Sequence, residues 1–422
     1  MQNQELNKTQ ELVEKTSFFS KPFDRKKNSL NLIRLVLALT VILDHAFTLG
    51  DYGDDITFFD VNLGAWAVTG FFCISGYLIA GSRLNGKLGE FLIKRIARIY
   101  PGFFVVQVLT LVLFAPIAKL LNDHTLSGYM TETPTPVHYF IKNLTLSLWM
   151  ENYEIGNTLS NVPAVNTWNG PLYTLFYEFT SYLIVAILLS WFVTKKTPVF
   201  VGIWIVGIVL QFNFQRVSLW DQTLQPGTGH NVFFLLVRLV PIFLGGSIVF
   251  MVQRRFKKFY WQVALVSLIV TFAVLFTVPL GEAKLGIISP FLTYVLLWFA
   301  NTFTFGKVGA FTIKHDISYG VYIYGWVMQQ MIMLFVVNGF IPKPPIWLYD
   351  LATIELTLFF ATLSWLLVER PVLMRVRGES IKKRSKKKQL QAQDLSDEVK
   401  DMITHYLNDT ATEVKPTTQK IR

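Results

Sequence analysis

Long runs of apolar residues, separated by short polar stretches, fill most of this chain of 422 residues. A helix needs about 20 predominantly apolar residues to cross the hydrocarbon core of a bilayer. The runs predict an all-α, polytopic membrane protein of about ten transmembrane helices, and the weak boundary at Lys195 and Lys196 leaves nine or eleven open. The predicted spans are 29–49, 63–82, 101–121, 170–193, 197–213, 232–252, 260–279, 286–305, 316–338 and 350–369.

The composition agrees with a membrane location. Hydrophobic residues make up 52% of the chain and charged residues 16%, whereas a soluble protein carries nearer a quarter. The net charge of +11 does not indicate nucleic-acid binding, because the positive residues lie in short clusters between the apolar runs. Cys73 is the only cysteine, which excludes an intrachain disulfide and a cysteine-based metal site, and we expect no metal.

The positive clusters also predict the orientation. If the N-terminus is cytoplasmic, the basic residues in 25–27, 83–98, 254–258 and 382–388 all fall inside, and both termini are cytoplasmic. The first 28 residues lack the apolar core of a signal peptide. We therefore expect three parts. They are a cytoplasmic segment (1–28), a membrane domain (29–372) and a cytoplasmic tail (373–422) with a basic run before either an amphipathic helix or partly disordered chain.

Ionisable residues inside membrane spans are costly and mark candidate functional sites. Arg34 and His45 lie eleven residues apart in the first span, which places them on one helix face about 16 Å apart along the axis. Arg34 could instead reach the inner headgroups, and His45 could be an interfacial histidine. Asp44 faces about 100° away from His45 and is expected at the outer rim only.

Glu178 and the pair Arg95 and Arg98 are the other charged candidates for functional residues. Glu178 lies about 12 Å below the outer end of its span, where a buried carboxylate requires a partner such as His45 or an arginine. Arg95 and Arg98, in a predicted inner loop (83–98), share a helix face and suit a phosphate group. The alternative for this arginine pair is a topological anchor.

Six short segments occur in a fixed order and together resemble the acyltransferase-3 family of membrane acyltransferases. Two departures occur within them, Tyr77 for phenylalanine and Tyr173 for tryptophan. At Gly325 the family often has a histidine, so a role for that histidine is not carried over. The segments are Arg34 with His45, Phe71–Tyr77, Phe91–Pro101, Tyr173–Glu178, Asp316–Gly325 and Val368–Pro371.

The resemblance implies a membrane O-acyltransferase in the bacterial cytoplasmic (inner) membrane. Its donor would be acetyl-CoA or a related short acyl-CoA, with the phosphates at Arg95 and Arg98 and the pantetheine arm passing Arg34. Imidazole suits general-base catalysis near neutral pH, so His45 would activate the acceptor hydroxyl. Glu178 would orient the imidazole or stabilise its cation. The family's usual acceptors are surface polysaccharides, O-antigens and glycolipids. The oligomeric state is left open.

A transporter or flippase for a glycan or lipid-linked intermediate is the alternative function. In that case the polar residues inside the spans would bind their ligand without reacting with it. Turnover of an acyl thioester distinguishes the two functions, because only the enzyme catalyses it.

Overall fold

The structure is a computed structural model, and it describes residues 20, 22–24, 27–146, 154–191, 195–220, 232–256, 258–279 and 281–378. The basic run and the amphipathic helix predicted in the tail lie outside these residues. The chain divides into two compact units, residues 1–369 and 370–422. All candidate site residues belong to the first unit.

The described residues form an all-helical protein with one short antiparallel hairpin, β1 (Thr57–Phe58) and β2 (Val61–Asn62). This confirms the predicted all-α class. The helices of the first unit are α2 (Leu30–Gly50), α3 (Leu63–Leu84), α4 (Leu88–Leu109), α5 (Ala115–Asp123), α6 (Pro136–Asn143), α7 (Thr174–Leu188), α8 (Thr197–Trp220), α9 (Val232–Gln253), α10 (Trp261–Thr277), α11 (Lys284–Thr302), α12 (Gly306–Lys314), α13 (Ser318–Val337) and α14 (Ile346–Ser364). Short π or 3₁₀ turns also occur at Thr110–Phe114, Gly170–Tyr173, Gly281–Ala283 and Trp365–Glu369, and α15 (Arg370–Val376) belongs to the second unit.

Eight segments of the described chain are long and apolar enough to cross a bilayer. They are Leu30–Gly50, Leu63–Leu84, Leu88–Asp123, Gly170–Leu188, Phe233–Gln253, Gly281–Thr302, Ser318–Val337 and Ile346–Val376. The other two predicted spans, 197–213 and 260–279, correspond to the shorter apolar helices Thr197–Asn213 and Trp261–Thr277. The chain is therefore a multi-pass membrane protein, and the count of ten stays a prediction.

The predicted third span, 101–121, lies within a longer helical segment that also covers most of residues 83–98. Helix α4 begins at Leu88 and continues through a π turn into α5, which gives an uninterrupted segment of 36 residues, Leu88–Asp123. Such a segment is about 54 Å long and exceeds the hydrocarbon thickness. Arg95 and Arg98 therefore lie on one helix, as their spacing predicted, and Arg98 pairs there with Asp316.

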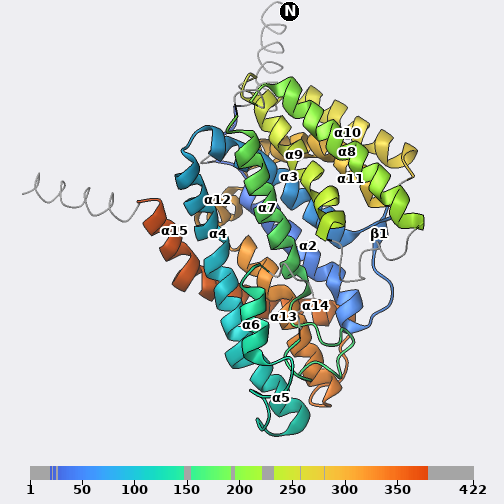
Figure 1. The fold of residues 1–422 in the computed structure, drawn as a ribbon, viewed down its shortest axis with the longest axis vertical. Coiled ribbons are helices and arrows are strands. Elements are labelled where there is room, and N and C mark those ends of the chain that lie inside the picture. The colour runs from blue at the N-terminus through green and yellow to red at the C-terminus, as the bar shows by residue number, and fades with distance from the viewer. Residues whose placement is uncertain are drawn as a thin grey trace, which may run out of the picture. The chain divides into compact units, whose positions relative to one another are not determined.

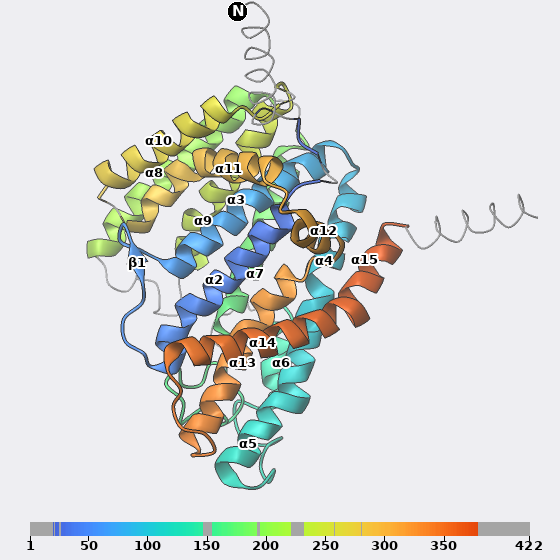
Figure 2. The ribbon, with the colours of Figure 1, turned by 180° about the vertical axis from the view of Figure 1, so that it is seen from behind.

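Helices α2, α3, α9 and α13 pack closely at the centre of the first unit (Figures 1 and 2). Helix α3 lies against α2 and α9, and α13 lies against α2 and α14. Gly76 of α3 faces the backbone of α9, and Gly246 of α9 faces the backbone of α3, so a side chain at either position would collide with a carbonyl group. These glycines therefore allow α3 and α9 to pack closely.

The chain between α6 and α7 packs on α13. Trp326 Nε1 donates to the carbonyl of Thr167 at 2.8 Å, and Asn169 Nδ2 donates to the carbonyl of Ile323 at 2.8 Å. The Gln330 amide donates to the carbonyl of Thr167 at 2.9 Å. These bonds fix the segment that leads into α7 beside the helix that carries Trp326.

Candidate active site

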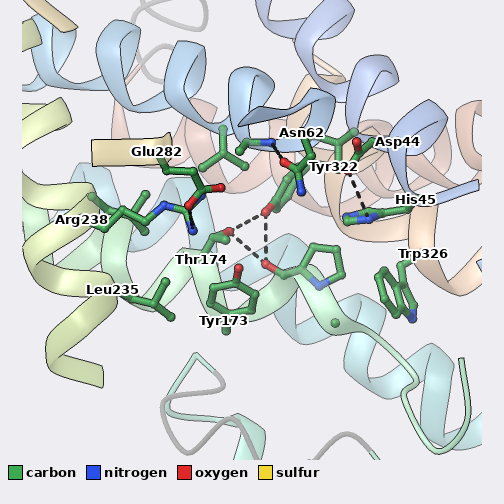
Figure 3. Close-up of a pocket in the computed structure, with 17 residues that line it drawn as sticks. Asp44, His45, Asn62, Tyr173, Thr174, Leu235, Arg238, Glu282, Tyr322 and Trp326 are labelled. Atoms are coloured by element: carbon green, nitrogen blue, oxygen red, sulfur yellow. Dashed lines mark hydrogen bonds and ion pairs between the residues drawn. The ribbon is translucent and has the colours of Figure 1, made fainter. Parts of the chain in front are cut away.

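An outer cavity of about 300 Å³ surrounds His45 (Figure 3). Helices α2, α3, α7, α9 and α13 contribute to its wall, together with the turns before α7 and α11. His45, Asp44 and Trp326 lie on one side of the cavity, and Arg238 and Glu282 lie on the other. The polar and aromatic lining residues are Asp44, His45, Asn62, Tyr173, Thr174, Arg238, Glu282, Tyr322 and Trp326.

The imidazole of His45 is positioned by two neighbours. Its ring meets that of Trp326 edge to face, with 4.9 Å between the centroids. Its Nδ1 lies 3.9 Å from Oδ2 of Asp44, a distance for charge attraction that is too long for a hydrogen bond. Nδ1 is thus the ring nitrogen that faces Asp44, and Nε2 is turned away from that carboxylate.

Asp44 is more central than its helical position predicted. Its side chain is 4% exposed, and its carboxylate lies against Gly64 at the start of α3. A side chain at position 64 would collide with this carboxylate. The prediction of a rim residue was wrong, because the N-terminus of α3 covers the face of α2 that carries Asp44. Helix termini offer unpaired N–H groups to carboxylates.

A second cluster lies deeper along α2, around Asp316. One oxygen, Oδ2, lies 3.1 Å from Nη1 of Arg34 and 2.7 Å from Nη2 of Arg98. Ser318 Oγ donates to the other oxygen, Oδ1, at 2.7 Å. The carboxylate thus ties α2 and α4 to the beginning of α13, and the Arg98 guanidinium lies 5.7 Å from the ring centroid of Tyr319.

The pKa of Asp316 is set by two opposing effects. Burial favours the neutral acid, but Arg98 and then Arg34 favour the carboxylate and hold the pKa of Asp316 below its usual value. Asp316 is therefore ionised at neutral pH and neutralises part of the charge of the arginines. Sequence reasoning missed this residue, although it opens the Asp316–Gly325 segment.

Glu178 and Arg95 lie near this cluster. The Glu178 carboxylate accepts hydrogen bonds from Ser75 Oγ at 2.8 Å and from the Tyr182 hydroxyl at 2.6 Å. Arg95 lies over the ring of Phe91, with 5.8 Å to its centroid, and acts electrostatically on Tyr182. The carboxylate next to His45 is Asp44, so the orienting role predicted for Glu178 has a second candidate.

Arg34 and Glu178 line a narrow middle space of about 40 Å³. Val68, Thr174 and Tyr322 border both this space and the outer cavity. The hydroxyls of Thr174 and Tyr322 hydrogen-bond to each other, and each also reaches the carbonyl of Pro171. This group of hydroxyls forms the partition between the two spaces.

An inner cavity of about 540 Å³ lies at the start of α2, where Asn31, Tyr77 and Lys94 line it. The inner cavity, the middle space and the outer cavity therefore follow α2 in order, at Asn31, Arg34 and His45. The helix rises about 21 Å from Asn31 to His45. The described residues contain no group of three histidine, cysteine or acidic side chains that could hold a metal ion.

The apolar helices and the family match together define a multi-pass membrane acyltransferase. Residues 27–368 match the family described as an acyltransferase domain, and the chain belongs to the acyltransferase-3 family. This confirms the family resemblance and the enzyme class, and it sets the transporter alternative aside.

Two curated relatives match over most of their length. The O-acetyl transferase of Shigella phage Sf6 is 28% identical over 83% of this chain and 97% of that protein. Nodulation protein 10 of Rhizobium leguminosarum bv. viciae is 24% identical over 85% of this chain and 96% of that protein. No solved structure matches the chain significantly.

Proposed function

We propose that this membrane O-acyltransferase moves an acetyl or other short acyl group from acyl-CoA to a hydroxyl of a cell-surface polysaccharide, O-antigen or glycolipid. The observation that carries the proposal is the order of the cavities along α2, from the arginine cluster to His45. The name of the phage relative supports acetyl as the group and oxygen as its destination.

The donor enters from the end of the molecule where α2 begins. Arg95 and Arg98 hold its phosphates, because guanidinium groups suit phosphate oxygens. The pantetheine arm follows α2 past Arg34 toward His45, a rise of about 16 Å that is comparable with an extended pantetheine chain. Asp316 holds Arg34 and Arg98 in place along this path.

The thioester crosses the middle space, and Arg34 and Glu178 flank it there. The hydroxyls of Thr174 and Tyr322 must then give way, because they separate this space from the outer cavity. Hydrogen bonds from Ser75 and Tyr182 hold the Glu178 carboxylate beside this passage.

The transfer itself takes place beside His45. Its Nε2 removes the proton of the acceptor hydroxyl as the oxygen attacks the thioester carbonyl carbon. The C–O bond forms and the C–S bond breaks, and the proton passes from His45 to the departing CoA thiolate. Asp44 stabilises the imidazolium that forms between these two proton transfers.

The enzyme lies in the bacterial cytoplasmic membrane, with about ten spans and both termini in the cytoplasm. Residues 1–28, 29–372 and 373–422 are the cytoplasmic segment, the membrane domain and the cytoplasmic tail. A reporter that is active only outside the cytoplasm should be active when fused after Asp60 and inactive when fused after Arg255. The reverse pattern would overturn this orientation.

Release of the CoA thiol by the purified protein tests the reaction. Acetyl-CoA is supplied with and without a glycan acceptor, and free thiol is measured. We expect thiol release that depends on the acceptor and is accompanied by acetyl ester on the glycan. Thiol release without ester formation would show hydrolysis only and would contradict the proposed transfer.

A further inference from the structure

The outer cavity contains an ion pair that the transfer chemistry does not use. Nη1 of Arg238 in α9 lies 2.6 Å from Oε2 of Glu282 in the turn before α11. The two side chains are 16% and 27% exposed, so the pair is largely withdrawn from solvent. It faces the cavity from the wall opposite His45 (Figure 3). Buried ion pairs contribute little net stability, so this pair is a candidate for ligand recognition.

The groups around this pair match the chemistry of a sugar. A guanidinium has five N–H donors, and the contact with Glu282 joins Nη1 of Arg238 to one carboxylate oxygen, Oε2. The Glu282 carboxylate supplies acceptors, and the Asn62 amide also lines the cavity. The rings of Tyr173 and Trp326 offer flat apolar surfaces. Donors and acceptors side by side suit adjacent hydroxyls, and aromatic rings suit the C–H face of a pyranose.

The charge of the cavity distinguishes between sugars. Among the described lining residues, Asp44 and Glu282 are acidic and Arg238 is basic, so the lining carries one excess negative charge when His45 is neutral. An acidic sugar would meet two carboxylates and a guanidinium that is already neutralised. Like-charge contacts of this kind suppress unwanted ligands, whereas an uncharged sugar meets no such repulsion.

We infer that the outer cavity selects an uncharged sugar unit as the acceptor. Arg238 and Glu282 bind adjacent hydroxyl groups of that unit, and Glu282 excludes acidic sugars by masking Arg238. The inference takes the glycan nature of the acceptor from the proposed function. It adds that the sugar unit bound in the cavity is uncharged. It assigns to both residues a role in specificity, at a distance from the reacting atoms.

Binding of two matched sugars without any acyl donor tests the inference independently of transfer. Methyl β-glucoside and methyl β-glucuronide differ only in oxidation at C6. Saturation-transfer NMR on the full-length protein in detergent micelles gives both affinities. We expect the glucoside to bind at least about tenfold more tightly than the glucuronide. Equal binding, or tighter binding of the glucuronide, would overturn the inference even if acyl transfer occurs.

Two variants should change the ratio of glucoside affinity to glucuronide affinity in opposite ways. Glu282→Gln unmasks Arg238 and should bring the ratio to about one or reverse it. Arg238→Gln removes the positive charge and three of the five N–H donors, so glucoside affinity should fall about tenfold and glucuronide binding should weaken further. Asp51→Asn is the matched control, because Asp51 is exposed, pairs with Lys343 outside the cavity and has a left-handed backbone that asparagine tolerates.

The wild-type ratio decides the inference even if one variant does not fold. A Glu282→Gln protein that elutes as a single species and keeps the wild-type ratio would refute the role of Glu282. An Arg238→Gln protein with unchanged glucoside affinity would refute the role of Arg238.

Discussion

The outer cavity and the arginine cluster lie on the same helix, yet they differ in charge and in space. Around Asp316, two guanidinium groups converge on one carboxylate oxygen, and the neighbouring space is only about 40 Å³. Around His45, the charges lie on opposite walls of a cavity of about 300 Å³. Under the proposed function, the first region suits an anionic, extended donor, and the second has room for a sugar ring.

Under the proposed function, α2 connects two kinds of recognition. The cluster, held by ion pairs between helices, would bind the donor by charge. The outer cavity would hold the acceptor beside the imidazole of His45. The five predictions below test this division, from the largest expected effect to the smallest.

Loss of the base should have the largest effect. His45→Gln removes the proton acceptor and should lower kcat for acyl transfer by about 10²–10⁴, with little change in KM for acyl-CoA. The exposed His138 of α6 provides the control variant His138→Gln, which should behave as wild type. A correctly inserted His45→Gln protein with near-native kcat would remove His45 as the base.

Removal of the carboxylate at the centre of the cluster should destabilise the protein. Asp316→Asn leaves Arg34 and Arg98 without their shared carboxylate partner, and the free energy of unfolding should fall by about 3–5 kcal/mol. Chemical denaturation in detergent micelles measures the change, with exposed Asp54→Asn as the control. Equal stability of the two variants would show that the cluster does not need its carboxylate.

Asp44 should contribute to the rate through charge alone. At about 4 Å a unit charge is worth about 1–4 kcal/mol, depending on the local dielectric, so Asp44→Asn should lower kcat about tenfold or more. Glu178→Gln provides the comparison, since Glu178 is the other carboxylate predicted to act on His45. If Glu178→Gln lowers kcat and Asp44→Asn does not, the orienting role belongs to Glu178.

The arginines should act on the donor. Arg95→Ala and Arg98→Ala should raise KM for acyl-CoA about tenfold, because hydrogen bonds to charged groups are worth about 1.5–3 kcal/mol, and should leave KM for the acceptor nearly unchanged. Arginine-to-lysine variants should restore part of the affinity. Lys87→Ala removes an exposed cation just before α4 and serves as the control. Unchanged donor KM would make both arginines topological anchors.

Acid should weaken the cluster only at low pH. The pKa of Asp316 in the folded protein lies below the usual aspartate value of about 3.9. The stabilisation by Asp316 is therefore complete at pH values above about 3.9, and it is lost as the pH falls through the folded-state pKa. The stability difference between wild type and Asp316→Asn should therefore stay constant from about pH 8 to 5. A difference that already declines within this range would show that the pKa of Asp316 is raised instead.

The sequence predicts the helical class and most span positions well, because burial in lipid imposes long apolar runs that a local pattern reveals. It places the start of the third span at residue 101, whereas the helix begins at Leu88. It also finds the arginines but not their partner, because Asp316 lies more than 200 residues from Arg98 and meets it only through packing. Asp44 was underestimated for the same reason, since α3 covers it.

The sidedness of the reaction tests the central claim most directly. Inverted membrane vesicles expose the cytoplasmic face to added acetyl-CoA, and right-side-out vesicles do not. With isotopically labelled acetyl-CoA outside and a glycan acceptor trapped inside, the inverted vesicles should form labelled acetyl ester. Right-side-out vesicles and inverted vesicles that contain His45→Gln protein should form almost none. Labelled ester of equal amount in both vesicle types, or in the His45→Gln vesicles, would contradict a path for the acyl group along α2 to His45.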